Sequence, residues 1–182
     1  MAAWNIIDHN EFTGSASSYS VTGFSTSYDH LLWIMSLRTD SAGATGYWID
    51  YSGLRFGTSG SLDTGSNYDS VVMEATSTGA GSIVSDNTLA QSSIRTIKTL
   101  GTNATADCFS CVKVWVPFYS STDKWAQAII QVGSTAASAT ANQFAVQHIG
   151  GQWRNTGAIN SIGIYDISGS NYIALSTYTL YG

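Results

Sequence analysis

The residues best placed to do chemistry are Cys108 and Cys111, which form a C-x-x-C pattern in the segment DCFSCVKVWV. Two thiolates at this spacing can bind zinc or act as a redox pair. A structural zinc ion normally needs two further ligands, but there is no second C-x-x-C pair, and His9, His30 and His148 are dispersed. Side chains three apart in a strand point to opposite faces, which disfavours a disulfide. We expect two reduced, partly buried thiols, no metal site and no cofactor.

Candidate acid–base residues are few. His30 follows Asp29, but it continues into a hydrophobic strand, where a lone histidine is more often a structural, hydrogen-bonded residue. Asp63, Asp69 and Glu74 lie in and after a turn, where aspartate commonly accepts hydrogen bonds from nearby backbone amides. The sequence has no spacing typical of a nucleophile elbow, a zinc protease, a P-loop or an EF-hand. We expect no catalytic residues and a protein that is not an enzyme.

Aromatic side chains are abundant, with six Trp and ten Tyr. An exposed row of them could stack against sugar rings, as in a lectin. The tryptophans that lie in hydrophobic strand patterns are expected in the core, namely Trp33, Trp115 and Trp125. The better candidates for exposure follow a Gly-rich turn and are Tyr47, Trp48 and Tyr51.

The elements that must position these residues are strands. Period-two alternation between turns rich in Gly, Ser, Thr and Asn is typical of antiparallel sheets. We expect about ten strands, near 3–8, 18–24, 29–38, 47–56, 67–75, 91–100, 108–118, 124–133, 143–149, 158–166 and 171–181. A short helix is an alternative for 91–100, a loop is expected at 134–141, Gly150-Gly151 is expected to be a hairpin turn, and Pro117 indicates an edge strand or a bulge. The expected fold is all-β, an antiparallel β-sandwich resembling a jelly roll, in one domain over residues 1–182.

The composition is typical of a folded β-domain. Charged residues make up 10% and aromatic residues 12% of the chain, whereas a disordered chain is rich in charge and poor in aromatics. The formal net charge of −5, with scattered basic residues, gives no footprint for nucleic acid. The N-terminus lacks a signal-peptide pattern, and the longest apolar run, 31–35, is far too short to cross a bilayer. We therefore expect no nucleic-acid partner, no membrane partner and synthesis in a cytoplasm.

The predicted strand 29–38 is apolar on both faces. One face carries only apolar residues, at positions 31, 33, 35 and 37, and the other face carries Leu32 and Ile34. A sheet with one solvated face normally alternates cleanly between apolar and polar residues. The strand is therefore either a central one covered on both sides, or its second face meets another subunit. Together with the low charge, this pattern favours an oligomer or a lattice-bound protein.

Several segments, taken in order, match one known pattern. The loop 63–68 reads D-T-G-x-N-Y and follows a short strand that ends in Phe56, while 28–32 and 37–40 match a Y-x-H-L strand and an [IL]-R-x-D exit. The segment 153–182 matches a W-R-x-T-x-A-I-x-S-I strand, a turn and a closing strand that ends in S-x-Y-x-L-Y-G. The chain resembles a β-domain family found in virion surface proteins of tailed bacteriophages, among them tail fibres, head fibres and capsid-bound proteins. None of these motifs is a catalytic signature.

The resemblance implies a structural protein on the outer surface of the phage particle, made in the host cytoplasm. Fibre proteins usually carry an attachment region and a stalk, whereas here the strand pattern begins at Trp4. We therefore expect a capsid decoration (cement) protein, a homotrimer whose partner is the major capsid protein of the head. The alternative is the receptor-binding tip of a tail or head fibre that recognises a host-surface glycan. A carbohydrate-active enzyme is a third hypothesis, which lacks an acid–base pair at a suitable spacing.

The interpretation of the C-x-x-C pair can be tested by thermal unfolding. Replacing Cys108 and Cys111 together by serine is expected to leave the melting temperature unchanged, and so is adding a chelator to the unaltered protein. A structural metal site would contribute folding energy outright, so its loss would be visible in the melting curve. A large drop in melting temperature on chelation would show that the pair binds a metal.

Overall fold

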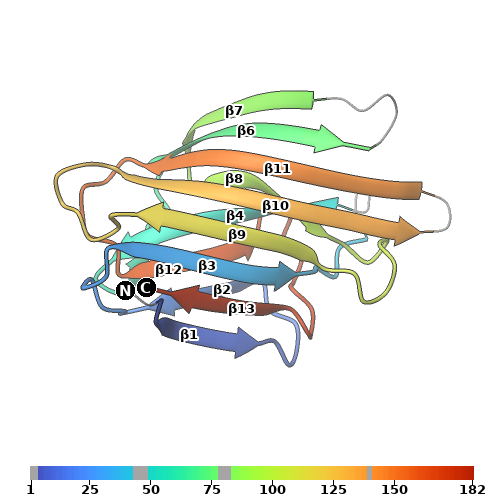
Figure 1. Cartoon of the computed structure of the whole chain (residues 1–182), viewed down its shortest axis with the longest axis horizontal. Helices are drawn as coiled ribbons and strands as arrows, with labels where there is room; N and C mark the ends of the chain where they lie inside the picture. The colour runs from blue at the N-terminus through green and yellow to red at the C-terminus, as the bar shows by residue number, and fades with distance from the viewer. Residues whose placement is uncertain (1–3, 43–48, 78–82, 139–140) are drawn as a thin grey trace.

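The computed structural model describes residues 4–42, 49–77, 83–138 and 141–182, which contain thirteen strands and no helix (Figure 1). Eight strands form the larger sheet in the order β1-β13-β3-β9-β10-β11-β6-β7. Their bounds are β1 Ile6–Glu11, β13 Thr177–Tyr181, β3 His30–Leu37, β9 Ser110–Pro117, β10 Ala126–Ser138, β11 Ala141–Trp153, β6 Tyr68–Thr76 and β7 Ile83–Gln91. The smaller sheet has the order β2-β12-β4-β5, and β8 also pairs with β4. Its strands are β2 Ser18–Thr22, β12 Ser161–Asp166, β4 Ile49–Thr58, β5 Ser61–Leu62 and β8 Ile94–Leu100.

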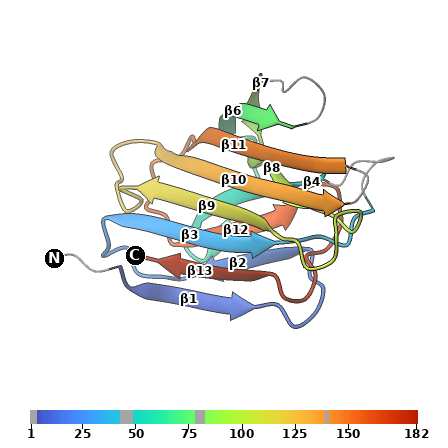
Figure 2. The ribbon, with the colours of Figure 1, turned by 45° about the vertical axis from the view of Figure 1, so that its right-hand side comes forward.

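The two sheets pack face to face, with the smaller sheet behind the larger one in Figures 1 and 2. All pairings between the named strands are antiparallel, so the expected all-β antiparallel sandwich is confirmed. A single large cluster of buried apolar side chains fills the space between the sheets, and its largest members are Trp33 and Trp153. Strand periodicity builds this core, because every second residue of β9 points inward and is buried, namely Val112, Val114 and Val116.

Each predicted strand range overlaps an observed strand, but two strands were not predicted. β5 has only two residues, and β7 has the sequence IVSDNTLAQ, in which Asp and Asn disfavour a strand. β7 forms nonetheless because it lies at the edge of the sheet and pairs along most of its length with β6. The range 91–100, for which a helix was an alternative, contains the strand β8.

The longest hairpin corrects two predictions. Residues 134–141 were expected to be a loop and Gly150-Gly151 a hairpin turn, but β10 extends to Ser138 and β11 continues through both glycines to Trp153. Strand pairing outweighs the weak strand preference of these small residues: 134–138 pair with β11, and Gly150 and Gly151 pair with both β10 and β6. Gly151 has a packing role, since a Cβ there would lie 2.5 Å from Cδ1 of the buried Ile94.

Two further predictions change at strand ends. Pro117 is not at a sheet edge, because it is the last residue of β9, a central strand between β3 and β10, and it pairs with His30. A proline is tolerated at the end of a strand because few hydrogen bonds between the strands lie beyond it to be interrupted. The closing strand, expected over 171–181, begins only at Thr177, since the preceding residues form a connection in which Leu175 has a φ of 70°.

Two segments that carry the family resemblance meet at one end of the sandwich. Asp63, in the D-T-G-x-N-Y loop, accepts hydrogen bonds from Trp153 Nε1 at 2.8 Å, Asn67 Nδ2 at 2.8 Å and the Gly65 amide at 2.7 Å. Asp63 directly follows β5 of the smaller sheet, whereas Trp153 ends β11 of the larger sheet. We call this arrangement the Asp63 latch, because one carboxylate links the two sheets.

A buried tyrosine strengthens the same connection. Tyr68 begins β6 of the larger sheet, and its hydroxyl accepts a hydrogen bond from the Phe56 amide of β4 in the smaller sheet at 3.0 Å. The same hydroxyl is 3.0 Å from the backbone carbonyl oxygens of Phe56 and of Asp63, to which it can donate. A buried hydroxyl with these partners stabilises the sandwich, whereas an unpaired one would destabilise it.

The latch predicts a pH-dependent loss of stability in the Asp63→Ala variant. Burial would raise the pKa of Asp63, but hydrogen bonds from Trp153, Asn67 and Gly65 outweigh it and hold the pKa below its ordinary value. Its stabilising contribution is therefore full above about pH 4 and is lost as the pH falls through the lowered pKa. We expect the variant to lose about 2–4 kcal/mol of unfolding free energy at pH 7 and less in acid.

Chemical denaturation of both proteins between pH 2 and pH 7 measures this difference. Asp123→Ala, an exposed aspartate in the loop before β10, is the control and is expected to stay close to the parent protein. A loss in Asp63→Ala no larger than in this control would contradict the role of the latch.

Candidate functional site

The structure separates the two cysteines. Cys108 lies before β9 and is half-buried beside the small apolar cluster of Leu100, Ala104 and Ala145, while Cys111 is exposed on β9. Both thiols are free, so the expected partial burial is confirmed for Cys108 and wrong for Cys111. Within the described ranges, no group of three or more His, Cys, Asp or Glu side chains could hold a metal ion.

The three candidate acid–base carboxylates, Asp63, Asp69 and Glu74, do not come together. Asp63 belongs to the latch, and Asp69 accepts hydrogen bonds from the Ala90 amide and Gln152 Nε2, both at 2.8 Å. Glu74 lies on the opposite face of β6 from Asp69 and forms an ion pair with Lys98. The expectation that these aspartates bond nearby donors is confirmed, and the geometry offers no shared acid–base site.

His30 has the structural environment expected of it. It begins β3, is half-buried, and its Nδ1 accepts a hydrogen bond from the Phe118 amide at 3.4 Å. Its ring centroid lies 5.0 Å from that of Phe118 and 5.8 Å from that of Trp115. Asp29 beside it is exposed. The interpretation of His30 as a hydrogen-bonded residue is confirmed, and its ring belongs to an aromatic group.

The tryptophans divide between core and surface. Trp33 is fully buried, as expected, but Trp115 and Trp125 are 36% and 48% exposed, so their placement in the core was wrong. Trp115 occupies an outward position of β9, and Trp125 lies directly before β10. Tyr51 is exposed, as predicted, whereas Tyr47 and Trp48 lie outside the described residues.

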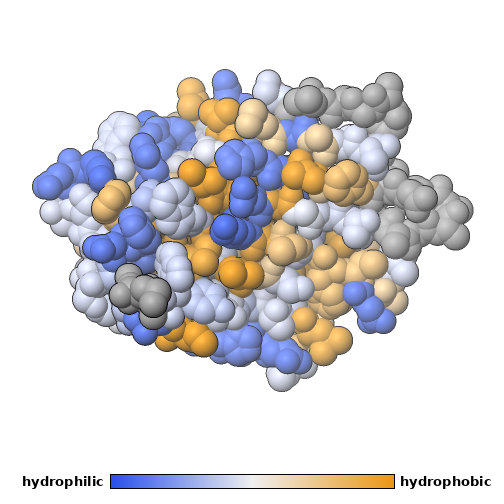
Figure 3. All heavy atoms as spheres, in the orientation of Figure 1, coloured by the Kyte–Doolittle hydropathy of each residue, from blue (hydrophilic) through white to orange (hydrophobic). Residues whose placement is uncertain are grey.

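The outward face of the larger sheet carries a set of exposed apolar side chains, most of them aliphatic. They come from β3, β6, β10 and β11 and are Ile34, Val71, Met73, Ile129, Phe144 and Val146. We call this surface the outer face. In the orientation of Figure 3, hydrophobic patches lie on either side of a hydrophilic one in the middle of the molecule. This chain therefore covers only one face of β3. Of the two possibilities that the sequence offered for the second face, contact with another subunit is the one that stays open.

Strand register arranges the outer face in rows. Lys113, Gln131 and His148 are in register across β9, β10 and β11 and form a polar row. The next row in one direction contains Trp115, Ile129, Gly150 and Val71. The next row in the other direction contains Cys111, Gly133, Val146 and Ala75. Each apolar row therefore includes a glycine, where the surface has no side chain.

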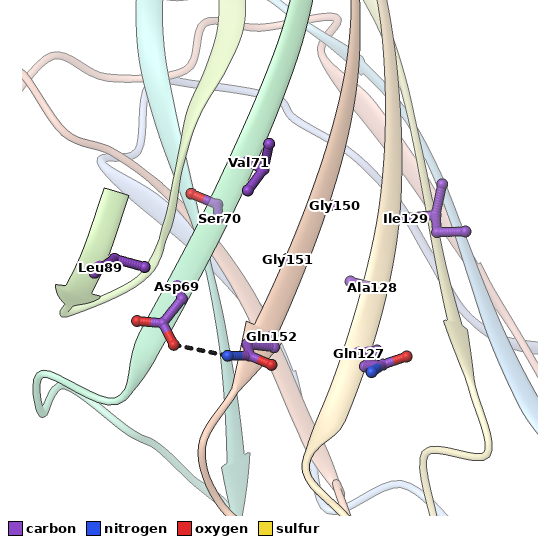
Figure 4. A pocket seen from close by; sticks show the side chains of 10 residues that line it. All are labelled: Asp69, Ser70, Val71, Leu89, Gln127, Ala128, Ile129, Gly150, Gly151 and Gln152. Carbon is purple, nitrogen blue, oxygen red and sulfur yellow. Dashed lines mark hydrogen bonds between the residues drawn. The ribbon is translucent and has the colours of Figure 1, made fainter. Parts of the chain in front are cut away.

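The glycine at position 150 creates a hollow of about 400 Å³ (Figure 4). No atom lies within 4 Å of the position that a Cβ would occupy there, and Ile129 and Val71 stand on the two flanking strands. At one end of the hollow, Gln152 donates a hydrogen bond to Asp69. Apolar walls with a polar end suit an inserted side chain from another protein, and the hydroxyl of Ser70, which also lines the hollow, is hydrogen-bonded to Thr88.

Comparisons with known proteins provide no relative from which a function could be transferred. No family model, no curated protein and no solved structure matches the chain. In the described part of the chain, no helix is long and apolar enough to span a membrane. The surface of this fold and the motifs of its sequence therefore have to indicate the function.

A second group of ionisable residues lies inside the smaller sheet, where Asp50 of β4 and Asp166 of β12 face each other. Asp50 accepts hydrogen bonds from Thr39 Oγ1 at 3.1 Å and from the Tyr51 amide at 2.9 Å. Asp166 Oδ1 accepts from the Ser170 amide at 2.8 Å, while its buried Oδ2 has no donor in the described structure. Sequence analysis missed this pair because the two residues are distant in the chain.

The pair is best described as two carboxyl groups that share one proton. Burial raises the pKa of Asp166 to about 6, and the adjacent charge of Asp50 adds to this effect. Burial also acts on Asp50, but hydrogen bonds from Ser168, Tyr51, Asp166 and Thr39 hold its pKa below the ordinary value. A proton on Asp166 Oδ2 can be donated to Asp50, which supplies the missing hydrogen bond.

This pair predicts that Asp166→Asn stabilises the protein at neutral pH. The folded state holds a proton on Asp166 that the unfolded chain releases near pH 4, so the stability due to this group falls as the pH rises towards 6. An asparagine keeps an acceptor for Ser170 and gives Asp50 a permanent donor. We expect the unfolding free energy of the variant, relative to that of the parent, to rise by roughly 1–3 kcal/mol as the pH is raised from 4 to 7. Denaturant unfolding measures this difference. A difference that does not change with pH would contradict the shared proton.

Proposed function

We propose that the protein is a structural component of a tailed-bacteriophage virion, a capsid decoration (cement) protein that binds the outer surface of the head and stabilises it. The observation that carries the proposal is the outer face, where this chain leaves apolar patches uncovered on either side of a polar row. Soluble monomers rarely expose large contiguous apolar patches, and such patches mark interaction surfaces. The order of motifs along the sequence, which resembles a family of virion surface proteins, supports the same role.

The outer face fits the demands of lattice binding. Ile129 and Val71 flank the Gly150 hollow, which can receive an apolar side chain of the major capsid protein, while Gln152 and Asp69 offer polar groups at its edge. Only 10% of the residues are charged, so affinity would come from buried apolar area and hydrogen bonds. Three copies around a local threefold axis of the head would close a ring. Each trimer would then clamp neighbouring capsid subunits against the pressure of the packaged DNA.

The interior contacts also favour a structural role. Asp63, Asp69 and Glu74 each bond a neighbouring side chain or amide, which stabilises the fold and occupies the groups that catalysis would need. The segments that carry the family resemblance contribute Asp63 and Trp153 to the latch between the sheets. A rigid sandwich that presents one broad face is suited to mechanical reinforcement of a shell.

The proposal predicts that Ile129→Lys abolishes binding to heads that lack the protein. Burying an unpaired ammonium group in an apolar contact should weaken binding by more than about tenfold. The control is Leu175→Lys, which changes an exposed leucine outside the outer face and should bind like the parent. Light scattering should give the mass of a trimer for the parent protein, and head binding should depend only weakly on salt.

Two outcomes would overturn the proposal. One is equal head binding by Ile129→Lys and the parent protein. The other is a strict monomer that ignores heads but adsorbs to host cells, which would favour the receptor-binding tip of a fibre. The number of copies per particle separates the same two roles, because hundreds of copies indicate decoration and a few tens or fewer indicate a fibre.

A further inference from the structure

A second exposed surface lies where β3 begins, β9 ends and β10 begins, near the C-terminus in Figure 1. Its members are aromatic and come from four segments: Trp4, His30, Trp115, Phe118 and Trp125. We propose that this surface, which we call the aromatic shelf, is a binding site for a neutral oligosaccharide. The site goes beyond the proposed decoration role, which uses the outer face and assigns no ligand to the shelf.

The aromatic rings of the shelf are exposed to solvent and are not buried in the large apolar core. Trp4, Phe118 and Trp125 are about half-exposed, and Trp115 is exposed to a lesser degree. The outer face, by contrast, presents mainly Ile, Val and Met side chains. Aliphatic side chains suit a protein partner, whereas flat rings offer faces on which a flat ligand can stack. The two surfaces therefore differ in chemistry and should differ in partner.

The backbone at Phe118 holds its ring in this exposed position. Its φ of 48° lies in the left-handed region, which is rare for a bulky residue and costs free energy. The next residue, Tyr119, is buried, so the chain turns one ring outward and the next inward. The Phe118 ring packs edge-on against His30 and lies 4.5 Å from Lys124 Nζ. The ring thus already has packing partners on the protein before any ligand binds.

Two hollows adjoin the shelf. One, of about 300 Å³, is lined by Trp115, Phe118, Lys124, Trp125 and Gln127 among others. The second, of about 450 Å³, is lined by residues that include Trp4, Ser27, Tyr28, Asp29 and His30. His30 lies between them, because it lines the second hollow and its ring contacts Trp115 and Phe118 of the first. Two small hollows side by side suit consecutive units of a chain-like ligand.

Sugar rings match this combination of surfaces. A pyranose has an apolar face of C–H groups that stacks on an aromatic ring, and hydroxyl groups at its edge that need planar hydrogen-bonding partners. Asp29 and Gln127 supply such partners at the two hollows. The formal charges of Asp29 and Lys124 cancel, and Lys124 already lies over the Phe118 ring. The balance of charge favours a neutral saccharide over an acidic one.

Titration of the full chain with chitohexaose, cellohexaose and maltohexaose tests the proposal, with calorimetry and tryptophan fluorescence as readouts. We expect at least one of these probes to bind with millimolar or tighter affinity, and Trp125→Ala to weaken that binding at least tenfold. Phe144→Ala is the matched control, since Phe144 is as exposed as Trp125 but lies on the outer face. Failure of all three probes to bind, or equal binding by Trp125→Ala, would overturn the proposal.

Phe118→Gly separates a binding role from a folding role. Glycine adopts a positive φ without strain, so the melting temperature should be no lower than that of the parent, while probe binding should be lost. A lower melting temperature with unchanged binding would show that Phe118 serves the fold and would overturn the proposal. Head binding should be unaffected in Trp125→Ala. Sugar binding should be unaffected in Val146→Lys, which changes the outer-face row on the far side of the polar row from Trp115. The sugar site and the decoration role can therefore fail independently.

Discussion

The sandwich depends on one constraint, which is that the polar groups at the ends of its core must find partners across the two sheets. Asp63 meets this constraint at one end, where it accepts hydrogen bonds from Trp153 of the larger sheet and from its own loop. At another point between the sheets, the fully buried Tyr172 donates its hydroxyl to Ser52 of β4 at 2.8 Å. Satisfied polar groups of this kind let the 28 buried residues of the core cluster pack between the sheets at little cost in unpaired groups, with Trp33 Nε1 as an exception that has no partner in the described structure.

Strand periodicity also determines which side chains remain on the surface and are available for binding. Since inward positions of the larger sheet are taken by the core, alternate positions must face out, and in this chain many of them are apolar. Where those outward side chains are mainly aliphatic, with Gly150 and Gly133 as gaps, the surface is suited to a protein partner. Where they are aromatic and ringed by Asp29, Lys124 and Gln127, the surface is suited to a small polar ligand with an apolar face. One fold thus presents two surfaces of different chemistry.

The sequence predicted the fold class and the inner face of β3, because period-two patterns report burial directly. It misplaced Trp115 and Trp125, because their apolar character was given more weight than their position: Trp115 shares the outward face of β9 with Lys113, and Trp125 lies in the loop before β10. The sequence pattern indicated a turn at Gly150-Gly151. Gly151 is instead required by close packing against Ile94, which is distant in the chain, so the sequence alone could not show it. The Asp50–Asp166 pair was invisible for the same reason, since pairing of β4 with β12 brings the two carboxyl groups together.

The central claim is that the outer face becomes buried when the protein assembles, and Cys111 is a natural reporter of that event. Its thiol is exposed in the single chain and lies in the outer-face row with Gly133 and Val146, whereas the half-buried Cys108 lies elsewhere and serves as an internal reference. The rate of alkylation by N-ethylmaleimide can be measured for each thiol by mass spectrometry, in the free protein and on phage heads. Burial of the outer face predicts that Cys111 reacts readily in the free protein and is protected on the head, with Cys108 unchanged. Equal reactivity of Cys111 in both states would contradict it.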